Sequence, residues 1–149
     1  MFDPGRVGLL RVEADGGRPE PVTSQDREID KQDLSWPHFL PDGRTLLVTT
    51  GVPGSVSAQL AVLSMTEGRW RRLGPGSQAV YLPSGHVVYH AVNLREGQVH
   101  AVAFDVQHLE FQGMPVSVLE NVFRAADGGG VYFAVAQNGT LIYTQGGYD

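Results

Sequence analysis

The sequence predicts an all-β fold, which is indicated by its composition, its regularly spaced turns and the lack of a helical pattern. Of the 149 residues, 19 are Gly and 9 are Pro. These 28 residues make about 19% of the chain, against about 12% in an average protein. A chain so rich in turn formers is expected to fold into many short elements. No window has convincing 3.6-residue amphipathicity, and the mostly polar segment 22–34 is expected to be a loop.

Composition also excludes several classes of protein. The hydrophobic fraction of 42% and the net charge of -5 argue against a disordered chain. The absence of Cys excludes disulfide frameworks, Cys-based zinc sites and thiol nucleophiles. Only 11 residues are Lys or Arg, which argues against nucleic-acid binding. We expect no membrane insertion and no signal peptide, so a cytoplasmic location is the default expectation.

Short runs rich in β-branched, aromatic and leucine residues define the expected strands. These runs cover residues 44–50, 59–63, 86–89, 98–104 and 140–144. Between them stand pairs that favour tight hairpin turns, because Gly, Asn and Asp accept a positive φ. The pairs are Asp15-Gly16, Asp42-Gly43, Glu67-Gly68, Ser84-Gly85, Glu96-Gly97 and Asn138-Gly139.

Two families of hairpin recur along the chain. The segment 39–48, FLPDGRTLLV, aligns with 81–89, YLPSGHVVY, and more loosely with 135–143. The second family comprises 8–16, 59–65 and 99–105, and its members lead into the strand candidates 20–23, 70–73 and 116–119. Interleaved hairpins with a period of about 40–50 residues are typical of four-stranded β-propeller blades. A β-sandwich of similar hairpins is the alternative.

The repeats amount to three blades in a single half-propeller domain over residues 1–149. Strands c and d of a shared blade are expected at 6–23, whole blades at 35–74 and 78–119, and strands a and b of a shared blade at 131–145. Three blades cannot close a ring, since propellers have four to eight. We therefore expect an obligate homodimer that joins its terminal half-blades into one six-bladed ring. The alternatives are a piece of a longer gene product, or a different mode of association.

The segment 35–44, SWPHFLPDGR, resembles the repeat of TolB-like (WD40-like, PD40) propellers. The match is closest to the propellers attached to bacterial serine/threonine protein kinases, and it covers residues 7 to 146. The resemblance implies a six-bladed sensor or protein-interaction module of bacterial origin, and relatives of this type often work outside the cytoplasmic membrane. It brings no catalytic residues. The chain has no Gly-rich phosphate loop, His-Arg-Asp or Asp-Phe-Gly motif of a kinase.

We expect no catalytic residues, no cofactor and no metal site. His86 and His90 are four residues apart, which in a strand separates their Cα atoms by about 13 Å and prevents joint chelation. The acidic run from Asp26 to Asp33 is interpreted as a solvated loop. The arginines around Trp70, in GRWRRL, are expected to protect an outermost strand from sheet-to-sheet addition.

The most promising binding surface is the expected mouth of the central channel. Trp36, His38, Tyr81 and Tyr132 stand at the starts of three candidate innermost strands. They are candidate contacts for a protein or peptide partner or a small ligand, and inter-blade packing is the alternative. The favoured function is a non-enzymatic binding or scaffold module. A propeller hydrolase, glycosidase-like or lactonase-like, is the alternative, and it is disfavoured because Asp42 is nearly the only carboxylate near the innermost strands.

Overall fold

A computed structural model describes residues 9–22, 33–52, 55–92, 97–125 and 130–146. Within these residues the chain forms antiparallel strands and turns and contains no helix, which confirms the all-β prediction. It follows that no helix in this part of the chain is long and apolar enough to cross a membrane. Most of the expected loop at 22–34, with Asp26, lies outside the described residues, and β3 already begins at Leu34.

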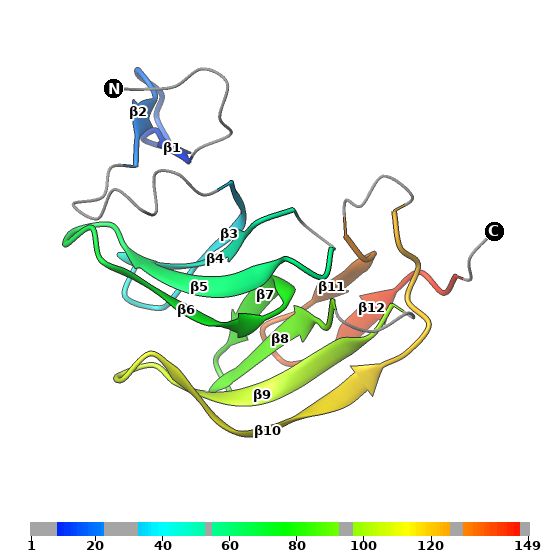
Figure 1. The fold of residues 1–149 in the computed structure, drawn as a ribbon. Coiled ribbons are helices and arrows are strands. Elements are labelled where there is room, and N and C mark those ends of the chain that lie inside the picture. The colour runs from blue at the N-terminus through cyan, green and yellow to red at the C-terminus, as the bar shows by residue number, and fades with distance from the viewer. Residues whose placement is uncertain (1–8, 23–32, 53–54, 93–96, 126–129, 147–149) are drawn as a thin grey trace.

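The described residues contain twelve strands, which form four sheets (Figure 1). β1 (Leu10–Arg11) and β2 (Glu20–Pro21) form the N-terminal pair. The first large sheet has the order β3 (Leu34–Phe39), β4 (Thr45–Thr50), β5 (Gln59–Ser64), β6 (Trp70–Pro75). The second large sheet contains β7 (Ser77–Leu82), β8 (His86–His90), β9 (Val99–Asp105) and β10 (Glu110–Leu119) in chain order. β11 (Phe133–Val135) and β12 (Leu141–Tyr143) form the C-terminal pair.

Three apolar clusters join the four sheets in chain order. The largest lies between the two large sheets and includes Leu47 and Phe104. A second contains Leu46 on the opposite face of the first large sheet, and Leu9, beside the N-terminal pair, packs against it. A third contains Val88 and joins the second large sheet to the C-terminal pair. Each large sheet is therefore covered on both faces, which explains why β4 is buried along its whole length.

The turn between β3 and β4 shows why the Pro-Asp-Gly sequence folds as it does. Gly43 has a φ of 67°, which glycine adopts without steric cost. Asp42 Oδ1 accepts hydrogen bonds from the backbone N–H groups of Arg44 and Thr45, both at 2.8 Å, and Oδ2 accepts one from Thr45 Oγ1 at 2.7 Å. Burial alone would raise the pKa of Asp42, but these hydrogen bonds outweigh it and lower the pKa. The carboxylate therefore serves the turn.

Both large sheets begin with an irregular first strand. The pairing of β3 with β4 shifts between Ser35 and His38, and that of β7 with β8 shifts between Ser77 and Val80. Within these shifts Trp36 has a φ of 50° and Gln78 a φ of 61°. Positive φ is uncommon for residues other than glycine. Since Trp36 and Gln78 occupy equivalent positions of the repeat, this backbone conformation is a repeated feature of the fold.

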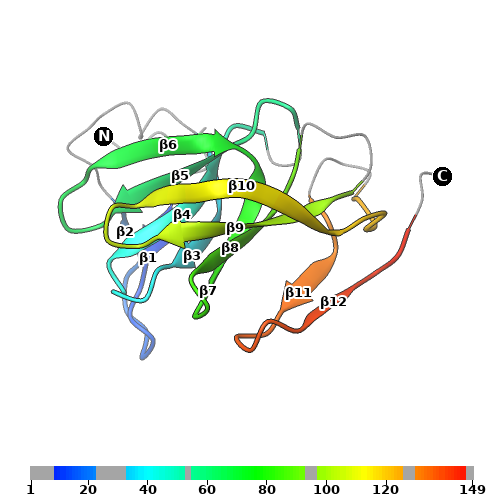
Figure 2. The same ribbon diagram turned by 90° about the horizontal axis from the view of Figure 1, so that it is seen from below.

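The strands of each large sheet are arranged in the same order in space. In Figure 2 the last strands, β6 and β10, lie uppermost, whereas the first strands, β3, β7 and β11, lie lower. β7 contacts both β3 and β4 of the preceding sheet. The first strands of the two large sheets are therefore close neighbours, which positions the candidate site.

Candidate ligand-binding surface on the first strands

The structure brings together Trp36 of β3, Gln78 of β7 and Gly130, which lies shortly before β11. A Cβ atom on Gly130 would lie 2.7 Å from Gln78 Oε1 and 3.1 Å from Trp36 Cζ2. Gly130 has a φ of 135°, which side chains rarely adopt. Glycine is thus needed here both for its backbone conformation and for the space that its neighbours occupy.

Gln78 connects the sheets on both of its sides. Its backbone N–H donates to Thr49 Oγ1 in the first large sheet at 3.0 Å. Its side-chain Nε2 donates to Val131 O at 2.9 Å, and Val131 N donates to Gln78 Oε1 at 3.1 Å. Thr49, Gln78 and Val131 are all buried. Gln78 was not among the residues predicted from the sequence, although its alignment with Trp36 one repeat earlier was a signal that could have identified it.

The four residues selected from the sequence occupy different environments. Trp36 is 42% exposed beside Gln78, and Tyr132 is 52% exposed. His38 is half-buried at the end of the irregular part of β3. Tyr81 packs against the cluster between the large sheets, with its ring 6.2 Å from that of Phe104. Tyr81 therefore has the inter-sheet packing role that was the alternative for these residues, while their role in ligand binding stays a prediction.

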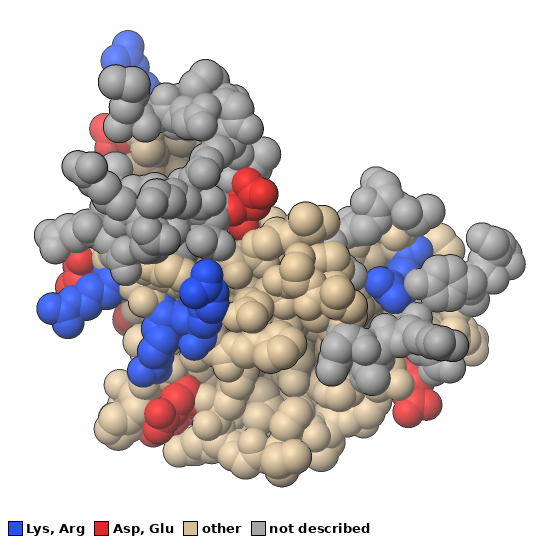
Figure 3. Space-filling model, in the orientation of Figure 1, with Lys and Arg blue, Asp and Glu red and all other residues tan. Residues whose placement is uncertain are grey.

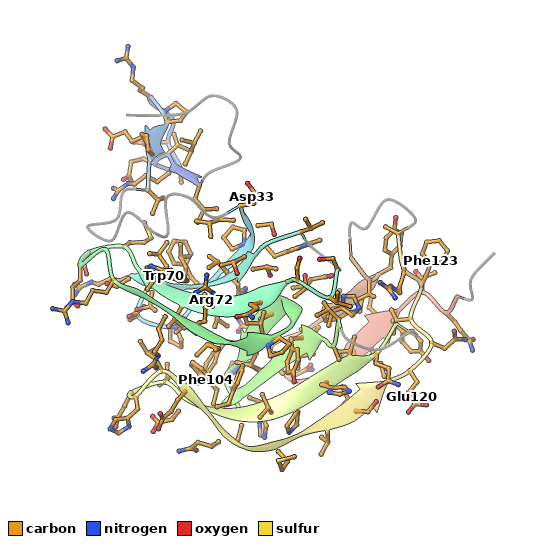
Figure 4. The ribbon with its side chains drawn as sticks, viewed as in Figure 1. Asp33, Trp70, Arg72, Phe104, Glu120 and Phe123 are labelled. Atoms are coloured by element: carbon orange, nitrogen blue, oxygen red, sulfur yellow. The ribbon has the colours of Figure 1, made fainter. Side chains whose placement is uncertain are left out.

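Tyr132 lines an open depression on the C-terminal pair. The depression has a volume of about 360 Å³ and is lined by Tyr132, Phe133, Ala134, Ile142, Tyr143 and Thr144. The ring of Tyr132 packs edge to face on that of Phe123, with 5.1 Å between centroids. Figure 4 shows Phe123 beside the C-terminal pair, far from Trp70 and Arg72 on β6. Aromatic and aliphatic side chains make up most of its lining.

His90 is a buried titratable group that the sequence did not distinguish from His86. His86 is exposed at the start of β8, whereas His90 is fully buried at its end. Burial, with a smaller contribution from the charge of Arg124, lowers the pKa of His90 to about 4. Neither ring nitrogen of His90 has a hydrogen-bond partner among the described residues, and the same holds for Oγ of Ser77, its cross-strand neighbour.

The charged side chains outside the candidate binding surface lie on the surface of the protein. In Figure 3 some of the arginine side chains lie over the region of β6, and most of the surface below them is tan. β6 is an edge strand, as predicted from GRWRRL, and the Arg72 guanidinium lies 4.7 Å from the centre of the Trp70 ring. Asp105 Oδ2 and His108 Nδ1 are 2.7 Å apart in an exposed turn, so that the pKa of Asp105 is lowered and that of His108 raised. In the described part of the chain no three His, Asp or Glu residues are grouped as a metal site requires.

No protein-family model matches the chain, and neither does any curated protein.

Proposed function

We propose that the chain is half of a six-bladed β-propeller, that two copies close the ring, and that the ring is a non-enzymatic binding or scaffold module. The observation that carries the proposal is the series of sheets with two, four, four and two strands, each packed on the next. These strand numbers are the ones expected of two whole four-stranded blades and two complementary half-blades. The contact of β7 with β3, and the hydrogen bonds of Gln78 in β7 with Val131 just before β11, support a radial arrangement of the first strands.

The binding role is supported by the side chains at one repeated position of the first strands. This position holds Trp36 in the first large sheet, Gln78 in the second and Tyr132 before β11. Trp and Tyr offer large apolar surfaces at low entropic cost, and they are enriched where proteins bind partners. The resemblance of segment 35–44 to TolB-like propellers supports the same role. We propose a protein or peptide ligand that contacts Trp36 and Tyr132.

The assembly is tested by light scattering together with small-angle X-ray scattering. The proposal expects a mass near twice 16.1 kDa and a scattering profile of a compact disc. A mass near that of one chain, with a β-rich circular dichroism spectrum, would contradict the two-copy ring.

The binding role is tested with a peptide library. The chain has two tryptophans, so Trp70→Phe leaves Trp36 as the sole tryptophan reporter. Peptides selected from a random library on this variant should change the fluorescence of Trp36. By calorimetry, Trp36→Ala should weaken their binding by about tenfold or more, whereas Val56→Ala, in an exposed loop, should leave it unchanged. Failure to select any peptide, combined with turnover of nitrophenyl glycosides or lactones, would instead support the hydrolase alternative.

A further inference from the structure

The hairpins of β3–β4, β7–β8 and β11–β12 provide sets of equivalent residues that can be compared for burial. In each hairpin the last residue before the turn faces the first residue after it. These facing residues are Leu40 with Thr45, Leu82 with His86, and Ala136 with Thr140. Two residues beyond Thr45, His86 and Thr140, the equivalent residues are Leu47, Val88 and Ile142.

The side chain of Ile142 is exposed where its equivalents are buried. Leu47 is 0% exposed and Val88 3%, because the following sheet covers each of them. Ile142 is 68% exposed. Its neighbour Leu141 packs against the second large sheet, so Ile142 points away from that sheet. The C-terminal pair therefore presents to solvent the face that a further sheet covers elsewhere in the fold.

Phe39 shows the same difference at the other end of the stack. The residue two positions before each turn is Phe39, Tyr81 or Val135. Tyr81 and Val135 both pack against the preceding sheet. Phe39 is 54% exposed, although it shares a face with its buried cross-strand neighbour Leu46. Within the described part of the chain, the first strand of the first large sheet thus has no neighbour like those that cover its two equivalents.

The outer strands also carry exposed apolar side chains, one near each end of the chain of sheets. Leu9 packs on the first large sheet, and Leu10, on the opposite face of β1, is 55% exposed. Val116 of β10 is 60% exposed and faces the same way as its cross-strand neighbour Ala101, toward the side of the C-terminal pair. The cluster that joins the second large sheet to the C-terminal pair reaches β10 only at Leu119, so that Val116 stays exposed. In the sequence repeat the N-terminal pair, with 8–16 aligned to 59–65 and 99–105, corresponds to the outer strands of a large sheet.

We infer that the C-terminal pair of one copy and the N-terminal pair of a second copy form one mixed four-stranded sheet, in which β12 lies beside the second copy's β1. This inference rests on the proposed two-copy ring and specifies its surfaces. Ile142 packs on the face that contains Phe39 of the second copy, and Leu10 of the second copy covers β10 near Val116. The two-fold axis repeats these contacts at a second seam, as an isologous dimer requires.

The chain allows a direct test by complementation. Ile142→Arg and Phe39→Arg each place an unpaired charge in both seams and should raise the dissociation constant of the dimer by about 100-fold or more. Both side chains are exposed in one copy, so each variant should keep the circular dichroism spectrum of the wild type. Val56→Arg, at a site that is 80% exposed in the loop after β4, is the matched control and should stay dimeric.

Mixing the two defective variants gives the decisive measurement. A mixed dimer has one seam with both original residues and one seam with both arginines. We expect native mass spectrometry to detect dimers with one chain of each variant, while each variant alone has the mass of one chain. A wild-type dimer that Ile142→Arg leaves intact, or a mixture that stays monomeric, would overturn the mixed sheet alone. A monomeric wild type would overturn the two-copy ring as well, and the binding role keeps its own peptide test.

Discussion

The side chain of Gln78 pairs with the backbone of Val131 as a neighbouring strand would. Its Nε2 donates to Val131 O at 2.9 Å, and its Oε1 accepts from Val131 N at 3.1 Å. These hydrogen bonds join the second large sheet to the segment before β11, and both partners are buried. A side chain at a repeated position therefore supplies a connection between sheets that backbone pairing does not supply.

Removal of this pairing should destabilise the protein. Gln78→Met keeps the approximate shape of the side chain but leaves two buried backbone groups of Val131 without partners. We expect the free energy of unfolding in urea to fall by about 2–4 kcal/mol. Gln137→Met, in the exposed turn between β11 and β12, is the control and should change it by less than about 0.5 kcal/mol. Equal effects of the two substitutions would show that the pairing contributes nothing.

Gly130 should tolerate no side chain. In Gly130→Ala the new Cβ would lie 2.7 Å from Gln78 Oε1 in a backbone conformation that alanine rarely adopts. We expect a loss of about 2–4 kcal/mol in the free energy of unfolding and a changed fluorescence spectrum of the adjacent Trp36. Gly17→Ala separates the two causes, since Gly17 has a φ of 124° and nothing within 4 Å of the added Cβ. It should cost only the backbone strain, about 1 kcal/mol.

Most of the strands could be predicted from the sequence because local signals agree with the fold. The runs at 44–50, 59–63 and 86–89 correspond to β4, β5 and β8, and the predicted turns at Asp42-Gly43 and Ser84-Gly85 precede β4 and β8. β10 is longer than predicted and begins at Glu110, because the bulge between Gln112 and Val116 lets Gly113 and Pro115 remain within the strand. Hydrophobic runs do not reveal such bulges.

The candidate site could be predicted only in part. Aromatic residues at the strand starts identified Trp36 and Tyr132, which remain exposed. Tyr81 looked equivalent but packs between the large sheets, because the position two residues before the turn faces the preceding sheet. Gln78 was missed since its importance depends on Val131, which is 53 residues away. Long-range partners of this kind have no signature in a single sequence.

Arg71 connects the outer strands of the two large sheets. Its Nη2 donates to the backbone carbonyl of His108 at 2.9 Å and to that of Leu109, in the turn between β9 and β10. We expect Arg71→Ala to lower the free energy of unfolding by about 1 kcal/mol, since the site is exposed. Faster hydrogen exchange should be confined to that turn and β6. Arg69→Ala removes only an exposed 4.0 Å ion pair with Glu67 and should have a smaller effect.

His90 should make the stability of the protein depend on pH between about 6.5 and 4. In the folded chain its pKa is about 4, whereas an unfolded histidine has a pKa of 6.5. As the pH falls through this window, the unfolded state binds a proton that the folded state does not bind. The folded state therefore loses stability on acidification, by on the order of 3 kcal/mol in total, and this contribution stops changing below pH 4.

The substitution His90→Leu isolates this contribution. Both ring nitrogens are buried without a hydrogen-bond partner among the described residues. An apolar side chain at this position should therefore lower the free energy of unfolding only a little at pH 7.5, and the variant can be compared directly with the wild type. Urea unfolding at pH 7.5, 6.5, 5.5 and 4.5 should show the two proteins diverging as the pH falls, with the variant relatively more stable at each step. Carboxylates that titrate in the same range are common to both proteins and cancel in the difference. Parallel curves over the whole range would mean that His90 takes up its proton as easily in the folded chain as in the unfolded one, and hence that its burial is relieved by groups able to accept its charge.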